Sequence, residues 1–252
     1  MAPRWRLFAG ATIIVLLVVL GLSRATAREL SGPRDSPSRQ RARASGEDEH
    51  TQRDYPARAG DPDLRLGAAI SQALVGAVLA GLAWYADVPA EAMGIDEPTG
   101  GIRSGVALGI ALFAANEAGT WVAARFGMES DESLRGLLAP DTRVDWALLL
   151  FLVLPIVAGV EELLFRGALI GALAAGFPVS PWLLAVLSSV AFGLGHGLQG
   201  SGGVLVTGVL GFALAAAFVI TGSLWVAIVA HYLVNALAFL VHEGIGVGWN
   251  GS

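Results

Sequence analysis

The residues of this sequence that could do chemistry are a few polar side chains inside otherwise apolar segments. They form three groups between residues 161 and 235. The groups are Glu161, Glu162 and Arg166; Phe192 and His196; and His231 and Asn235. A charged side chain at the centre of a bilayer costs about 2.5–3.5 kcal/mol even on lenient insertion scales. A chain that keeps such groups pairs them or uses them, so all are candidate site residues.

The first group predicts a free carboxylate beside an ion pair. Glu162 and Arg166 are four residues apart with the acid first, the favourable order for an ion pair on a helix. Glu161 points about 100° away around the helix and is left over. An unpaired carboxylate in an apolar site is a candidate general base. The alternative is an ordinary ion pair at a helix end near the lipid headgroups.

The second and third groups add two imidazoles and an amide. His231 and Asn235 are four residues apart and share one helix face, while His196 lies in a separate apolar segment. A single histidine inside a membrane more often makes an interhelical hydrogen bond than takes part in catalysis. Two histidines, an asparagine and a spare glutamate on three helices favour a joint site.

Counting along the predicted helices indicates that these groups meet at one depth. The predicted turn between the helix of Glu161 and the helix of His196 centres near Pro178. Glu161 precedes this residue by 17 positions and His196 follows it by 18. The same counting puts Asn235 within about 5 Å of this depth. We therefore expect one polar layer, towards the end of the bundle that carries the turn near Gly200.

Composition predicts which elements hold these residues. Of 252 residues, 54% are apolar and 15% charged, against about 45–50% and 25% in soluble domains. Long apolar runs predict an all-α, polytopic transmembrane helix bundle with about seven membrane-spanning segments. The runs are 7–22, 66–86, 102–126, 144–176, 181–199, 203–221 and 223–241. The chain has no cysteine and no lysine, which excludes disulfides, thiolate sites and a Schiff-base lysine.

Two features of these runs bear on how they pack. Pro155 lies inside the long run 144–176 and predicts a kink or break, with 144–154 as a lead-in and 156–176 as the crossing. Glycine pairs with GxxxG spacing allow close helix packing in lipid. These pairs are Gly105 and Gly109, Gly167 and Gly171, and Gly193 and Gly197.

The amino-terminal region leaves two interpretations open. Residues 1–23 predict a transmembrane anchor or a signal peptide, because Ala25-Thr26-Ala27 resembles a cleavage site. Residues 24–65 are rich in arginine and acids and predict a disordered linker. The positive-inside rule assigns this linker to the cytoplasm, and with it the end of the bundle near the Gly200 turn. Signal cleavage would instead leave the linker outside.

The three groups together resemble a known family. They read EExxxR, FxxxH and HxxxN, in this order over about 75 residues. This set is similar to that of the CPBP family, which includes type II CAAX prenyl endopeptidases, bacteriocin-processing proteins and abortive-infection-type membrane proteins. The resemblance covers roughly 144–241, a CPBP-like catalytic helix bundle. It does not extend to 66–143, with two transmembrane helices, or to the tail 242–252.

The resemblance implies a membrane endopeptidase, a multi-pass hydrolase of the cell membrane. It would cleave a peptide bond in a membrane-associated protein or peptide, as in CAAX-type or leader-peptide processing. Carried over residue by residue, Glu161 activates a water with the help of His196. His231 and Asn235 stabilise the oxyanion of the tetrahedral intermediate, and the ion pair within EExxxR holds the helix geometry. Expected partners are the lipid bilayer and a protein or peptide substrate, lipidated or not, and no nucleic acid.

Metal dependence stays open at this point. The family is often described as metalloproteases, and Glu161, His196 and His231 could ligate Zn²⁺ with a fourth position free. The sequence has no HExxH motif, and no third ligand remains if His231 donates to the oxyanion. A metal-independent glutamate mechanism is the favoured interpretation, with zinc as the alternative.

Two other functions compete with proteolysis. Asn116 and Glu117 lie in the middle of 102–126, where they either pack between helices or line a substrate path. Together with Glu161 and the histidines, Glu117 could form the proton or cation relay of a transporter. No internal repeat is visible, which disfavours a transporter. A non-catalytic membrane scaffold or immunity protein is the third interpretation.

Overall fold

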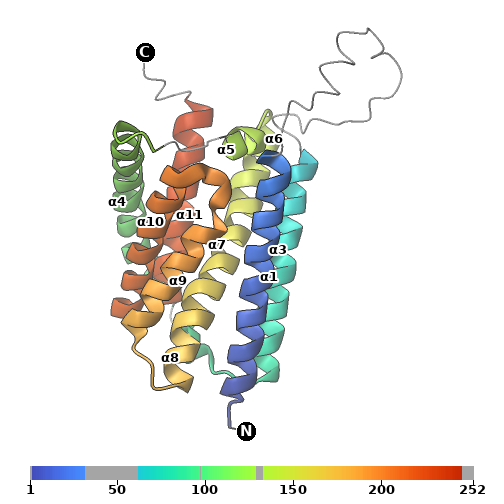
Figure 1. Cartoon of the computed structure of the whole chain (residues 1–252), viewed down its shortest axis with the longest axis vertical. Helices are drawn as coiled ribbons and strands as arrows, with labels where there is room; N and C mark the ends of the chain where they lie inside the picture. The colour runs from blue at the N-terminus through green and yellow to red at the C-terminus, as the bar shows by residue number, and fades with distance from the viewer. Residues whose placement is uncertain (1, 32–61, 97, 129–132, 246–252) are drawn as a thin grey trace, which may run out of the picture.

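The computed structural model describes residues 2–31, 62–96, 98–128 and 133–245, and every regular element in these ranges is helical. The α-helices are α1 (Trp5–Ser31), α3 (Pro62–Tyr85), α4 (Pro98–Arg125), α5 (Ser133–Leu138), α6 (Arg143–Leu148), α7 (Leu154–Glu162), α8 (Leu173–Gly176), α9 (Pro181–Gly195), α10 (Gly200–Thr221) and α11 (Leu224–Phe239). The longest of these helices lie side by side in one bundle. Helices α1 and α3 form one flank, and α4 lies on the opposite flank (Figure 1). The predicted all-α bundle is confirmed.

Six helical runs in the described residues are long and apolar enough to cross a membrane. They are Trp5–Thr26, Asp63–Tyr85, Gly101–Arg125, Arg143–Gly176, Gly197–Thr221 and Leu224–Gly244. Helix α9 is apolar too, but it has only 15 residues. The prediction of about seven segments is confirmed, and the chain is a multi-pass membrane protein.

The run 143–176 is one continuous helix, so the predicted break at Pro155 is wrong. Pro155 lies two residues after the end of a π-helical stretch, Leu149–Val153, and is the second residue of α7. Proline has no backbone N–H to donate to the preceding turn. The change from α to π hydrogen bonding just before Pro155 lets the helix continue without that hydrogen bond. A second π-helical stretch, Leu163–Ala172, continues the run from α7 into α8.

The boundaries of the predicted linker differ from the structure at both ends. Helix α1 continues through the Ala25-Thr26-Ala27 triplet to Ser31, and α3 begins at Pro62. Arg24 and Arg28 are exposed on the last turns of α1, at the end of the apolar span and just beyond it, where charged side chains are compatible with a helix. The remainder of the linker, 32–61, and the tail from 246 lie outside the described residues.

The glycine pair on α4 lets that helix approach α11 closely. A Cβ atom added to Gly105 would lie 2.7 Å from Val229 Cβ, and one on Gly109 would lie 2.8 Å from Leu233 Cβ. The predicted role of this GxxxG pair in packing is confirmed. In the other two pairs, Gly171 and Gly193 each face backbone at short distance, Gly167 is in ordinary contact with Met93, and Gly197 has nothing within 4 Å.

Candidate active site

A fully buried ion pair lies where α7 ends and the π-helical stretch begins. Arg166 donates from Nη1 to Oε1 of Glu162 at 2.7 Å, and both side chains are 0% exposed. Arg166 also donates from Nη2 to the carbonyl oxygen of Gly211 on α10, at 2.7 Å. Its guanidinium lies over the ring of Phe192, 4.7 Å from the ring centre. The predicted pair therefore exists, and it also ties the helix to α9 and α10.

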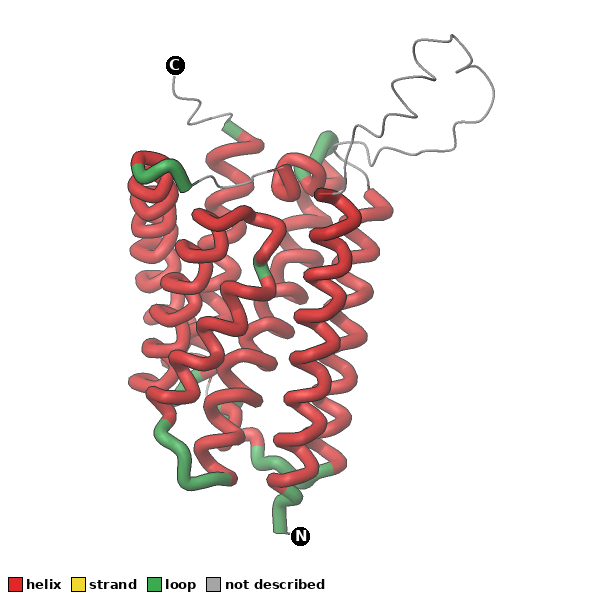
Figure 2. Tube along the Cα trace, viewed as in Figure 1, coloured by secondary structure: helices red, strands yellow, loops and turns green. Residues whose placement is uncertain are grey.

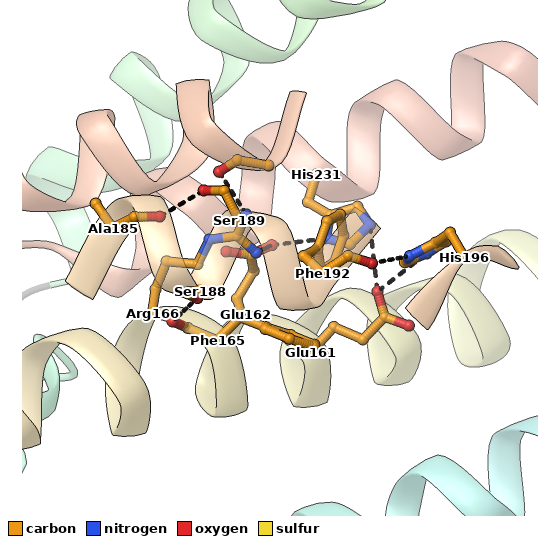
Figure 3. Close-up of polar contacts among 11 residues, drawn as sticks. Glu161, Glu162, Phe165, Arg166, Ala185, Ser188, Ser189, Phe192, His196 and His231 are labelled. Atoms are coloured by element: carbon orange, nitrogen blue, oxygen red, sulfur yellow. Dashed lines mark hydrogen bonds and ion pairs between the residues drawn. The ribbon is translucent and has the colours of Figure 1, made fainter. Parts of the chain in front are cut away.

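Glu162 holds a histidine as well as the arginine. Nδ1 of His231, on α11, lies 2.7 Å from Oε1 of Glu162, and the imidazole is buried (Figure 3). A carboxylate only accepts, so Nδ1 carries the proton of this bond. The other ring nitrogen, Nε2, is turned towards Oε2 of Glu161 at 3.8 Å. The buried Glu162 carboxylate thus fixes the orientation of the His231 ring.

His196 reaches the same carboxylate oxygen from α9. It is the residue at which α9 ends, and its Nδ1 lies 2.8 Å from the carbonyl oxygen of Phe192. Its Nε2 is 4.0 Å from Oε2 of Glu161. The Phe192 ring lies between the two imidazoles, 4.5 Å from that of His196 and 5.8 Å from that of His231.

The length of α9 explains the depth of His196. Fifteen residues of α-helix rise about 22 Å, whereas the 22 residues of α10 rise about 33 Å. A short non-helical break between α9 and α10 is visible below the upper end of the bundle (Figure 2). The chain therefore turns inside the bundle, and a 3₁₀ turn, Gly197–Gln199, leads on to α10. This early end of α9 lowers His196 into the polar layer.

Glu161 is the carboxylate that the ion pair leaves over, as predicted. Its side chain is 15% exposed, and Oε2 is buried without a hydrogen bond to any described residue. Its other oxygen, Oε1, lies 3.5 Å from Nε2 of Gln72 on α3. Gln72 was missed by sequence reasoning, since a single amide in an apolar segment gives no sign of which helix it faces.

Three atoms that can accept a proton therefore converge. They are Oε2 of Glu161 and Nε2 of His196 and of His231, with both Nδ1 atoms held by acceptors. At 3.8 and 4.0 Å, neither imidazole makes a direct hydrogen bond to the carboxylate. Separations of this size suit a small molecule that touches all three groups, and a water that is held and deprotonated is one such molecule.

The zinc alternative was tested on the same atoms. Two ligands about 2.0–2.2 Å from a tetrahedral zinc ion lie about 3.3–3.6 Å apart, closer than either histidine lies to Glu161. Within the described residues, no group of three or more His, Cys, Asp or Glu side chains is arranged to hold a metal ion. In this geometry the three side chains are spaced slightly too widely to ligate one zinc ion together, and zinc stays the alternative prediction.

Asn235 lies one turn beyond His231 on α11 and is half-buried. Its side chain makes no hydrogen bond to the described residues, so the structure joins it to the layer only through its shared helix face. Glu117 lies apart from the layer, with Oε2 bonded to Nε2 of His242 at 3.0 Å. Its neighbour Asn116 is half-buried on the same helix, α4.

Two buried serines near the layer are structural. Ser188 donates to the carbonyl oxygen of Phe165 at 2.7 Å, and Ser189 donates to that of Ala185 at 2.6 Å (Figure 3). Hydroxyls that donate to main-chain oxygens are satisfied without a base. This agrees with the absence of an acidic partner for either serine in the sequence.

Comparison with known proteins gives one match. Residues 143–237 match the family model of the type II CAAX prenyl endopeptidase Rce1-like proteins. No curated protein and no solved structure matches the chain. The matched segment contains all three motifs and every residue of the polar layer except Gln72. The segment 143–237 is therefore similar to the type II CAAX prenyl endopeptidase Rce1-like proteins, in agreement with the CPBP resemblance of its motifs.

Proposed function

We propose that this protein is an intramembrane endopeptidase of the cell membrane in which Glu161 activates water against a peptide bond. The observation that carries the proposal is the convergence of two imidazole nitrogens on one buried carboxylate oxygen. The family match of the segment 143–237 supports the same class of reaction. The substrate is a membrane-associated protein or peptide, with CAAX-type and leader-peptide processing as the two candidates.

Each residue of the layer has a part in the proposed reaction. Glu161 takes a proton from the water, and Nε2 of His196 accepts the second hydrogen and so orients it. The oxygen attacks the carbonyl carbon, the C–N bond breaks, and Glu161 returns the proton to the leaving amine. The Asn235 amide and, when its Nε2 carries a proton, the His231 ring donate to the oxyanion. Glu162 keeps the His231 ring in place throughout.

Cleavage of fluorogenic peptides by detergent-purified protein tests the proposal. The unmodified chain, Glu161→Ala and the matched control Glu117→Ala are assayed with and without a strong chelator. We expect activity in the unmodified chain and the control, none in Glu161→Ala, and no effect of the chelator. Because Glu117 bonds His242 rather than the layer, its variant controls for loss of a membrane carboxylate in general.

The remaining outcomes would each support a different mechanism or function. Loss with the chelator and with Glu161→Ala alike would support the zinc alternative. Activity that survives Glu161→Ala would contradict the proposed base. If no library peptide is cleaved, while Glu117→Ala and Glu161→Ala both abolish proton or cation flux in vesicles, the protein is a transporter.

A further inference from the structure

The further inference concerns Gln72, a residue of the amino-terminal part of the chain outside the family match. Helix α3 turns one stripe of residues towards the bundle at spacings of three and four. The stripe consists of Arg65, Ala69, Gln72, Gly76, Leu79 and Ala83. Beside it, Ser71 and Leu74 are exposed. Gln72 is therefore the one polar group of this stripe within the middle turns of α3.

An amide in this position needs a partner. Burying such a group in an apolar medium without a hydrogen bond costs free energy, and the group has two donors and one acceptor to satisfy. Nε2 of Gln72 lies 3.5 Å from Oε1 of Glu161. This is the long end of hydrogen-bond distance, as is common for catalytic groups before a substrate is bound.

The close approach of α3 to α7 depends on a glycine one turn away. Gly76 follows Gln72 by four residues, and a Cβ atom added there would lie 2.7 Å from Cγ2 of Val160. Val160 directly precedes Glu161 in the chain. A side chain at position 76 would require the Val160 side chain or the helix to shift, and a shift of α3 away from α7 would lengthen the contact between the amide and the carboxylate. The packing of the two helices is thus shaped around this contact.

The contact makes the two oxygens of Glu161 different. Oε1 faces the Gln72 amide, whereas Oε2 faces both imidazoles and has no hydrogen bond to a described residue. We propose that Gln72 is a positioning residue: it holds Oε1 of Glu161 so that Oε2 stays directed at the water to be activated. Helix α3 thereby belongs to the catalytic unit. This inference rests on the proposed function and assigns the residue that orients its base.

The first test is of the contact and needs no substrate. The chain contains no cysteine, so cysteine pairs can be introduced without other changes. We expect Gln72→Cys with Glu161→Cys to cross-link under mild oxidation or with a short thiosulfonate reagent. Ser71→Cys with Glu161→Cys is the matched control, because Ser71 is exposed and bonds only the Ala68 carbonyl oxygen. Equal cross-linking of both pairs, or of neither, would overturn the inference.

The second test is kinetic. Gln72→Leu removes the amide and keeps a similar volume, and we expect kcat to fall about 10–100-fold because a misdirected base loses its near-attack geometry. KM and the melting temperature should change little, and Ser71→Ala should match the unmodified chain. Unchanged kcat in Gln72→Leu, beside an inactive Glu161→Gln, would overturn the inference while leaving the proposed function intact. Activity in Glu161→Gln would instead overturn the proposed function itself.

A third variant separates positioning from packing. In Gln72→Glu two carboxyl groups face each other, and they repel when both are ionised. When the pair shares one proton, the protonated group can donate as Gln72 does. We expect the activity of Gln72→Glu, relative to the unmodified chain at the same pH, to rise as the pH falls. A ratio that does not change with pH would indicate a packing role and contradict the inference.

Discussion

The carboxyl-terminal and amino-terminal helices of this bundle are all apolar enough to cross a membrane, but the protein buries them to different extents. Mean hydropathy is 2.3, 2.4 and 2.1 for the runs 143–176, 197–221 and 224–244, against 2.2, 1.9 and 1.4 for those of α1, α3 and α4. In the most apolar window of each run, 39, 33 and 44% of residues are buried in the first group and 17, 17 and 11% in the second. Lipid covers the outer helices, so hydropathy reports membrane insertion while burial reports protein packing.

The difference implies that polar groups have different roles in the two regions. The inner helices bury Glu162, Arg166 and His231 in one network. The outer helix α4 contributes Glu117 to a separate contact with His242, in the run 224–244. Gln72 is the exception, because it extends from an outer helix to the inner layer. Each prediction below compares a residue of the buried network or of a close helix contact with a matched residue outside it.

The largest effect is expected for the histidines. His196→Ala removes a ring that faces Glu161 and bonds only the main chain of its own helix, so peptidase activity should fall about 10²–10⁴-fold, the range for a lost acid–base group. His242→Ala removes a ring that is bonded to Glu117, and activity should stay within about threefold since the layer is untouched. Initial rates on one fluorogenic peptide measure both. Equal losses would contradict a specific role of His196 in the polar layer.

The next effect concerns stability. Arg166→Ala leaves Glu162 as an uncompensated buried charge, which should cost about 3–5 kcal/mol of unfolding free energy. Arg135→Ala breaks a pair with Glu243 at 3.1 Å in which both side chains are partly exposed, and this should cost at most about 1 kcal/mol. Denaturant titration in detergent micelles measures both. A loss for Arg166→Ala as small as that for Arg135→Ala would show that the buried network is not a structural unit.

The smallest effect is expected from two glycines of one helix. In Gly109→Ala the new Cβ would lie 3.0 Å from the Cα and carbonyl oxygen of Ala230, so backbone must shift at a cost of about 1–3 kcal/mol. In Gly119→Ala the nearest atom is 3.6 Å away, on Val206, and stability should rise by about 0.5–1 kcal/mol. Thermal melting in the same detergent measures both. The reverse order would mean that α4 is not held against α11 as the structure has it.

Much of this architecture could be predicted because the bilayer imposes it. Apolar runs had to form helices, and the spacing of EExxxR had to bring Glu162 and Arg166 together on one of them. The common depth of Glu161 and His196 followed from counting residues about the turn near Pro178. These results depend on the regular rise and turn of a helix rather than on contacts between distant helices.

The remaining features depend on contacts between distant helices. Spacing predicted the His231 face but not that Nδ1 would bond Glu162, 69 residues away in the chain. The continuity of the helix at Pro155 needed a π-helical stretch, for which we know no local sequence signal. The Gln72 contact needed the approach of α3 to α7 at Gly76, which depends on how both helices pack.

The most direct test of the central claim compares two carboxylates on one substrate. Glu161→Gln and Glu117→Gln each remove one negative charge from the membrane region while keeping the size and hydrogen-bonding capacity of the side chain. With a cleaved fluorogenic peptide in hand, kcat is measured for both variants in the same detergent. We predict a loss of at least about 10²–10³-fold for Glu161→Gln and less than threefold for Glu117→Gln. Comparable kcat values for Glu161→Gln and the unmodified chain would contradict the assignment of Glu161 as the base.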